Sequence, residues 1–339
     1  MPVLKSNKIL ISLLILLMGF IVSYYGFILL QPASELLDTK VEKIIHIESG
    51  STVDKIASQL KEEEIIVDPL IFKFYLQFRG LSQQLRAGHY RLSSEMTISQ
   101  IIDKLVAGKM ASYKLTVPEG VTVENIAQRL EKEGIKKEVF LEIARKKGLK
   151  FLSRSQAEKD EIIYSLEGFL FPDTYQIPYG SSAQEIVAIM VQGFKERIEI
   201  LQSEIDESAY NTAEIITIAS LIQAEGRLDN ELPIISSVIY NRLDRGMKLQ
   251  IDATIQYILP ERKARLLYSD LKVDSAYNTY LNHGLPPGPI NNPGLKAIKA
   301  ALRPAETDYL YYVAIGDGEH KFTKTYREHL RVQRRLKDN

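Results

Sequence analysis

The chain contains no cysteine and no tryptophan, and it has no excess of charge of either sign. The absence of cysteine excludes disulfide bonds, thiol catalysis and metal sites with cysteine ligands. Lysine plus arginine and aspartate plus glutamate number 43 each, so no overall field favours nucleic acid or another polyanion as a partner. The 339 residues, 45% hydrophobic and 25% charged, are typical of a folded protein with two or three domains.

Motifs for metals and cofactors are also missing. No glycine-rich phosphate loop and no G-x-S-x-G nucleophile elbow occurs. The histidines show no H-E-x-x-H or comparable ligand spacing. We therefore expect neither a metal nor a cofactor. The histidines are His46, His89, His283, His320 and His329.

The longest hydrophobic run lies near the N-terminus. Residues 9–30 contain no charged side chain, and a helix needs roughly 20 apolar residues to cross a bilayer. A cleaved signal peptide is the alternative, but its apolar core is usually only about 7–15 residues long. Lys5 and Lys8 precede the run, which favours a cytoplasmic tail of residues 1–8. We therefore predict a single-pass helix in the plasma membrane, with the remaining chain outside the cytoplasm.

An internal repeat organises the first half of the chain. Residues 46–60 align with residues 116–130 without a gap. Each copy predicts a strand, a turn and a helix, because glycine permits the turn, threonine caps the helix, and apolar residues follow at helical spacing. The matching pairs are Gly50 and Gly120, Thr52 and Thr122, Val53 and Val123, Ile56-Ala57 and Ile126-Ala127, and Leu60 and Leu130.

The copies resemble the LysM module, a small βααβ unit that in many proteins binds polymers containing N-acetylglucosamine. An apolar helix over residues 69–78 and a strand over 87–92 are the other expected elements of such a unit. We predict a LysM-like domain over residues 40–111, with the second copy, near 115–135, opening the next domain. A purely structural unit that separates the enzyme from the membrane is the alternative to glycan binding.

A helix in the second half places a carboxylic acid next to a hydrophobic core. Residues 214–224 are apolar on nearly all sides, and Glu225 stands at the end of this helix, just before Gly226. The negative end of the helix dipole and partial burial both raise the pKa of a carboxyl group. A general acid at neutral pH requires such a raised pKa. A solvated glutamate at a frayed helix end is the alternative.

The sequence after this helix is rich in tyrosine, in asparagine and glutamine, and in proline. Residues 284–294 read as a loop of fixed shape, because they are rich in proline and asparagine. The tyrosines and amides of residues 247–257 and 275–280 can stack on sugar rings and bind hydroxyl groups. These properties suit a groove for a neutral polysaccharide.

The chain closely resembles the endolytic murein transglycosylase family, also called MltG or YceG-like. Gln223 and Ala253 depart from the residues that relatives often carry, glutamate and proline. The resemblance implies an α+β protein with a mixed α/β catalytic domain over residues 112–339. Collinear motifs carry it: 166–175 (LEGFLFPDTY), 218–225 (IASLIQAE), 241–243 (NRL), 249–252 (LQID), 277–280 (YNTY), 284–288 (GLPPG), 292–294 (NPG), 320–322 (HKF) and 328–329 (EH).

This resemblance implies cleavage of the bond between N-acetylmuramic acid and N-acetylglucosamine within a peptidoglycan strand. The product is a 1,6-anhydromuramoyl end, formed without water, and the catalytic glutamate falls on Glu225. An ordinary hydrolase needs a second carboxylate, for which Asp252, Asp173 and Glu167 are candidates. The residues expected to bind the sugars are Gln250, Asp252, Tyr277, Asn278, Tyr280 and His320.

Two other functions stay open. A non-catalytic scaffold would bind the wall and recruit peptidoglycan synthases. A hydrolytic muramidase would cut the same bond but leave reducing ends. A membrane-held enzyme would reach nascent strands, so we expect that cleavage ends strand growth and that synthases are partners.

Overall fold

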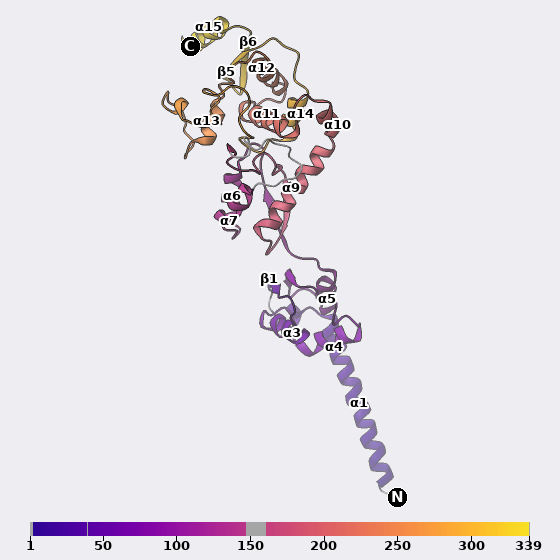
Figure 1. Ribbon diagram of the computed structural model, residues 1–339. Coiled ribbons are helices and arrows are strands. Elements are labelled where there is room, and N and C mark those ends of the chain that lie inside the picture. The colour runs from indigo at the N-terminus through magenta and orange to yellow at the C-terminus, as the bar shows by residue number, and fades with distance from the viewer. Residues whose placement is uncertain (1–2, 39, 147–160, 339) are drawn as a thin grey trace. The chain divides into compact units, whose positions relative to one another are not determined.

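The computed structural model describes residues 3–38, 40–146 and 161–338 (Figure 1). Contacts within the chain divide it into two compact units. We call residues 1–113 with 176–180 the N-terminal unit, and residues 114–175 with 181–339 the C-terminal unit. Helices and strands occur in both, so the fold is mixed, in agreement with the sequence.

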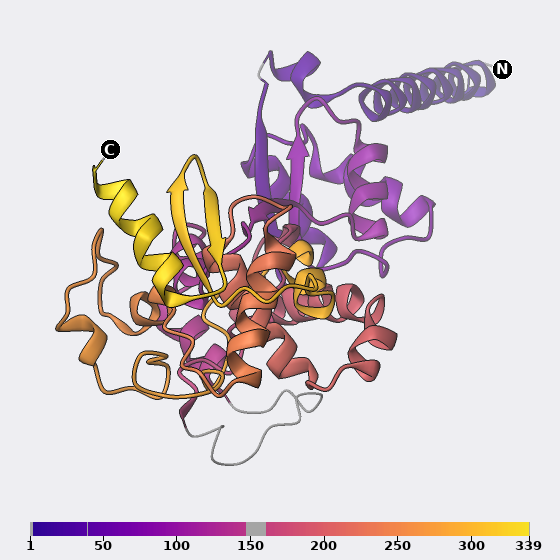
Figure 2. The same cartoon turned by 90° about the horizontal axis from the view of Figure 1, so that it is seen from above.

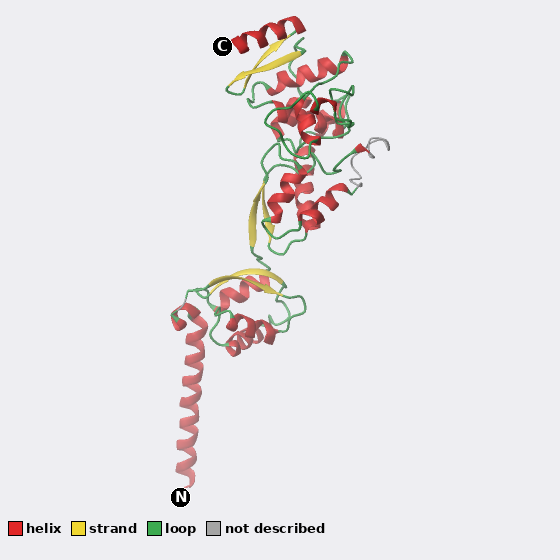
Figure 3. Cartoon of the chain, turned by 90° about the vertical axis from the view of Figure 1, so that its left-hand side faces the viewer, coloured by secondary structure: helices red, strands yellow, loops and turns green. Residues whose placement is uncertain are grey.

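The N-terminal unit contains a βααβ arrangement followed by a third helix. Strands β1 and β2 pair antiparallel, with Ile45 opposite Tyr90, and the helices pack on one side of them (Figure 3). Ile45, Tyr90 and apolar residues of the helices form one buried core. The predicted order of elements is therefore present, whereas glycan binding remains a prediction. The elements are β1 (Glu42–Ile47), α3 (Val53–Glu62), α4 (Pro69–Phe78), β2 (Gly88–Ser93) and α5 (Ile98–Ala107).

The internal repeat has the structure that the sequence predicts. Gly50 and Gly120 occupy the left-handed region, with φ of 78° and 76°. Thr52 and Thr122 each cap the helix that follows, accepting a backbone N–H at 3.2 Å. The second copy continues beyond the aligned residues, because a second helix and a strand paired with β3 complete another βααβ order among the described residues. Its elements are β3 (Ser112–Thr116), α6 (Val123–Glu131), α7 (Lys137–Arg145) and β4 (Thr174–Pro178).

The N-terminal helix forms, but the structure does not support the predicted membrane span. Helix α1 (Val3–Leu30) covers the hydrophobic run and is followed by α2 (Ala33–Leu37). Within the described residues, no helix has the length and hydropathy that crossing a membrane requires.

The C-terminal unit is built around helix α11 (Thr212–Glu225). All residues of α11 from Ile215 to Ile222 are buried, and helices α12 and α14 pack against it (Figure 1). The hairpin of β5 and β6 and helix α15 lie side by side near the C-terminus (Figure 2). The remaining elements are α9 (Ala183–Glu199), α10 (Gln202–Glu207), α12 (Leu232–Asp244), α13 (Asp252–Ile258), η1 (Asp270–Lys272), α14 (Leu295–Leu302), β5 (Tyr311–Gly316), β6 (Glu319–Thr323) and α15 (Tyr326–Asp338).

A buried carboxyl group joins three distant segments of this unit. Glu167 is 1% exposed, and its Oε1 accepts hydrogen bonds from the Val123 backbone N–H and the Asn292 side chain, both at 3.1 Å. Burial raises the pKa of Glu167 to about 8, although the bond from Val123 opposes the shift. Glu167 therefore favours its neutral form in the folded protein.

This raised pKa predicts a stability that depends on pH. The folded protein binds a proton more tightly at Glu167 than the unfolded chain does, so this contribution is full below pH 4.5 and lost as the pH rises through about 8. The variant Glu167→Gln cannot ionise. We expect the free energy of unfolding of the native protein to fall, relative to this variant, by on the order of 3 kcal/mol between pH 5 and 8.

Urea unfolding followed by tyrosine fluorescence at several pH values measures this difference. The exposed Glu133→Gln variant is the control and should follow the native curve. Parallel curves for the native protein and Glu167→Gln would show that Glu167 does not titrate in this range.

Candidate active site

Helix α11 fixes the position of Glu225. The helix begins at a capping box, in which Asn211 accepts from the Glu214 N–H at 3.1 Å and Glu214 accepts from the Asn211 N–H at 2.8 Å. It ends at Gly226, where an added Cβ would lie 2.3 Å from Leu232. The absence of a side chain at Gly226 leaves room for the buried Leu232 side chain directly after Glu225.

Side chains from two predicted motifs hold the surrounding segments. Asn241 donates to the backbone oxygens of Thr307 at 2.7 Å and Tyr309 at 3.0 Å, just before β5. The guanidinium of Arg242 donates to Leu310 O and Leu249 O, both at 2.7 Å. The N-R-L motif therefore fastens helix α12 to the hairpin and to the segment before α13.

A cleft of about 390 Å³ lies at the end of α11. It is formed by α11, α12, α15, the hairpin strands and the segment that leads into α13. Five of the residues selected from the sequence meet there: Glu225, Gln250, Asp252, Tyr280 and His320. Its other lining residues are Val238, Ile239, Arg242, Leu249, Ile251, Tyr311, Tyr312, Val313, Ala314, Tyr326, His329 and Gln333.

The environment of Glu225 favours its protonated form. The side chain is partly buried, and its Oε2 accepts a hydrogen bond from the Tyr312 hydroxyl at 3.0 Å. Burial is the main cause that raises the pKa of Glu225, and the negative charge of Asp252 adds to it. The Tyr312 hydrogen bond and His320 act in the opposite direction, but the net shift is upward. Glu225 therefore has the property of a general acid.

Asp252 and Gln250 contribute exposed polar groups to the same cleft. Asp252 is the first residue of α13, and its Oδ1 accepts from the Tyr280 hydroxyl at 2.5 Å. Gln250 has a φ of 52°, a left-handed backbone conformation that non-glycine residues adopt rarely. Such backbone strain occurs often at functional sites. The L-Q-I-D motif thus presents two polar side chains beside Glu225.

The structure does not bring the other selected residues to this cleft. Tyr277 and Asn278 are buried, and Asn278 donates to backbone oxygens of Leu271 and Val273 at 3.1 and 2.8 Å. Asn278 therefore shapes its own loop. Glu167 is buried in the packing described above, and Asp173 pairs with Arg197.

Sequence reasoning missed two residues near Glu225. Tyr312 carries the hydroxyl that binds Glu225, and Glu231 binds His320 with Oε2 2.8 Å from Nδ1. Tyr312 reads as an ordinary strand residue, and Glu231 reads as a polar residue before the proline of the next helix. Tyr312 and Glu231 become part of the site only because the hairpin of β5 and β6 packs against the end of α11 and the start of α12.

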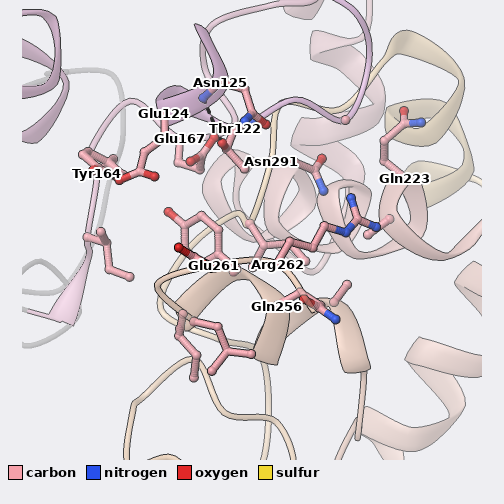
Figure 4. A pocket seen from close by; sticks show the side chains of 18 of the residues that line it. Thr122, Glu124, Asn125, Tyr164, Glu167, Gln223, Gln256, Glu261, Arg262 and Asn291 are labelled. Carbon is pink, nitrogen blue, oxygen red and sulfur yellow. Dashed lines mark hydrogen bonds between the residues drawn. The ribbon is translucent and has the colours of Figure 1, made fainter. Parts of the chain in front are cut away.

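A second and larger cavity, of about 820 Å³, lies in the same unit. The second repeat copy forms one wall, with Thr122 and Glu124, and Gln223 and Asn291 lie on the other side (Figure 4). Glu225 does not line it, although the preceding residue, Ala224, does. Glu167, whose pKa is also raised, lines this larger cavity, but its carboxyl oxygens are occupied by the Val123 N–H and the Asn292 side chain. We assign the chemistry to the smaller cleft because Glu225 is only partly buried there.

The cleft can supply proton transfer and sugar binding. No group of three or more histidine, aspartate or glutamate side chains able to hold a metal occurs in the described part of the chain. Tyrosines and the amides of Gln250 and Gln333 surround one carboxylic acid with a raised pKa, which suits protonation of a glycosidic oxygen.

Comparisons with known proteins identify the family of the chain. The model of the YceG-like family matches residues 45–335. The endolytic murein transglycosylase of Bacillus subtilis is 37% identical over 90% of this chain and 87% of its own length. The enzyme of the same name from Streptococcus pneumoniae R6 is 29% identical over 90% of this chain and 61% of its own length.

A solved structure shows the same fold. The crystal structure of a YceG-like protein from Listeria monocytogenes is 34% identical and covers 87% of this chain and all of its own, with a TM-score of 0.58. The resemblance found in the sequence is thus confirmed, and the chain belongs to the YceG-like family.

Proposed function

We propose that this protein is an endolytic lytic transglycosylase of peptidoglycan. The observation that carries the proposal is the partly buried Glu225, whose pKa is raised by burial in a cleft lined by tyrosines and amides. The name shared by the relatives from B. subtilis and S. pneumoniae supports the same activity. The bond cut is the one between N-acetylmuramic acid and N-acetylglucosamine within a strand.

The reaction begins with the proton of Glu225. Glu225 donates it to the glycosidic oxygen while positive charge develops on the muramic acid ring. The bond between C1 and this oxygen then breaks, and N-acetylglucosamine leaves with the proton. The C6 hydroxyl of the muramic acid then attacks C1 and loses its own proton to the carboxylate of Glu225, which restores the acid. The product is the 1,6-anhydro sugar, and no water is consumed.

A hydrolytic muramidase is the second candidate, because Asp252 places another carboxylate in the same cleft. A hydrolase uses such a group as a nucleophile or to activate water. Asp252 is engaged by the Tyr280 hydroxyl, which favours a role in orienting substrate. Hydrolysis leaves reducing ends, whereas transglycosylation leaves anhydromuramoyl ends, so the products decide between the two.

Cleavage by this mechanism depends on the carboxyl group of Glu225. We expect Glu225→Gln to lower cleavage of purified glycan strands by about 10²–10⁴-fold, the usual contribution of a general acid. Mass spectrometry of the products measures both the rate and the kind of end. The exposed Glu207→Gln variant should cleave like the native protein. Cleavage that persists in Glu225→Gln would remove Glu225 from the mechanism, and an inactive native protein would favour a scaffold.

The pH range of cleavage depends on the hydroxyl that binds Glu225. The Tyr312 hydrogen bond lowers the pKa of Glu225, so Tyr312→Phe should raise that pKa further. Because the acid acts when protonated, activity falls as the pH rises through this pKa. We expect this fall to move to higher pH in Tyr312→Phe. Tyr326→Phe, another tyrosine of the cleft, is the control, and an unchanged profile in Tyr312→Phe would contradict the assignment.

We propose that the βααβ unit of residues 40–111 binds the glycan. Support comes from its element order and its likeness to LysM modules. Soluble uncross-linked strands should therefore bind less tightly when this unit is deleted from the Glu225→Gln protein. Equal affinity with and without the unit would favour the alternative, a purely structural unit that does not bind glycan.

We also propose that the C-terminal unit works outside the cytoplasm at the plasma membrane, near the synthases that polymerise strands. The support for this location is the proposed substrate, because peptidoglycan lies outside the cytoplasm. Protease treatment of spheroplasts should digest the C-terminal unit, and crosslinking should recover a synthase. Protection of the unit together with a cytoplasmic control protein would contradict this localisation.

A further inference from the structure

The larger cavity, of about 820 Å³, shares a wall with the active-site cleft. On helix α11, Ala224 lines the cavity, whereas the next residue, Glu225, lines the cleft. The same change of side occurs at the start of α13, where Asp252 lines the cleft and Ala253 lines the cavity. The cavity therefore begins directly beside the position of the acid.

The lining of this cavity carries an excess of negative charge. Glu124 comes from the second repeat copy and Glu261 from the segment after α13 (Figure 4), and Glu119 is a third exposed carboxylate. One basic side chain, Arg262, opposes them. Glu167 is mostly neutral at pH 7, because burial raises its pKa to about 8. A cavity with this set of charges attracts a cationic group.

A buried acceptor without a partner lies in the same lining. Asn291 is 4% exposed, and its Nδ2 donates to the backbone oxygen of Ser220 at 2.8 Å (Figure 4). Within the described residues, Oδ1 of Asn291 accepts no hydrogen bond. A buried acceptor that stays unpaired costs free energy, so a ligand that donates an N–H is favoured there.

Peptidoglycan carries both kinds of donor on one substituent. The lactyl group of N-acetylmuramic acid bears a short peptide stem, which has amide N–H groups and a diamino acid as its third residue. Three extended residues span about 10 Å, so the side-chain amine can lie in the cavity while the sugar stays in the cleft. Cross-linking converts this amine into an amide, which has no charge.

We propose that the larger cavity binds the peptide stem of the muramic acid whose bond is cleaved, and that its carboxylates attract the free amine of the stem. This inference rests on the proposed function and deepens it, because it gives the enzyme a preference for stems that are not cross-linked. The carboxylates are those of Glu119, Glu124 and Glu261. Since they are exposed, salt should weaken the attraction.

The test compares glycan strands whose stems differ only at this amine. Acetylation removes the charge, whereas dimethylation adds bulk and keeps the charge. We expect kcat/KM of the native protein to be about tenfold higher on strands with free amines than on acetylated strands, mainly through KM. Dimethylated strands should behave like strands with free amines. Equal cleavage of free and acetylated strands would overturn the proposal.

Two sets of variants change the charge of the cavity in opposite directions. The double variant Glu119→Gln with Glu261→Gln should lower the ratio of the two kcat/KM values to about twofold, without changing the value for acetylated strands. Glu124 is kept, because it accepts the Tyr164 hydroxyl at 2.8 Å. Arg262→Gln should raise the ratio above the native one, which a loss of folding cannot do. Glu207→Gln, on α10, is the control and should keep the native ratio.

Binding to the Glu225→Gln protein tests the stem site without cleavage. Titration calorimetry should give a Kd about tenfold weaker for acetylated strands than for free ones, and a weaker Kd again for strands stripped of their stems by an amidase. Equal affinity for intact and stripped strands, or the same ratio in the native and double-variant cavities, would overturn the proposal. A native protein that binds in this order but cleaves nothing would instead refute the proposed function.

Discussion

The rest of the site depends on the burial of helix α11. A helix that is apolar on every side must be surrounded, and here α12, α13 and α14 enclose it. The helix therefore delivers Glu225 at a fixed point where the core meets solvent. Partial burial there raises the pKa of the acid, so one packing constraint determines both its position and the direction of its pKa shift.

The segments around Glu225 are held by hydrogen bonds to backbone. The single side chain of Arg242 joins α12 to two segments, through the backbone oxygen of Leu249 before α13 and that of Leu310 before β5. Buried Ser220, in the middle of α11, accepts from Ile290 N at 3.1 Å and from the Asn291 side chain at 2.8 Å. Several family motifs therefore position the segments around Glu225, and only a few side chains are left to take part in catalysis.

Local rules predicted much of this structure. The repeat showed its turns and caps because glycine with positive φ and threonine at the N-cap are signals within a few residues. The same holds for α11 and for Glu225 at its end. The burial of Tyr277 and Asn278 could not be predicted, because the residue type alone does not distinguish a tyrosine or asparagine that lines a groove from one that is buried in the core. The predicted membrane span in α1 is likewise unsupported.

Contacts between distant elements account for what the sequence could not show. Glu231 and Tyr312 matter only because hairpin β5–β6 lies against the ends of α11 and α12. Once that hairpin is placed, the cleft contains the partly buried acid Glu225, whose pKa is raised, and the imidazole of His320, held by the carboxylate of Glu231. The contacts that hold Glu225 and His320 join residues 87 and 89 positions apart in the sequence, which no local pattern reveals.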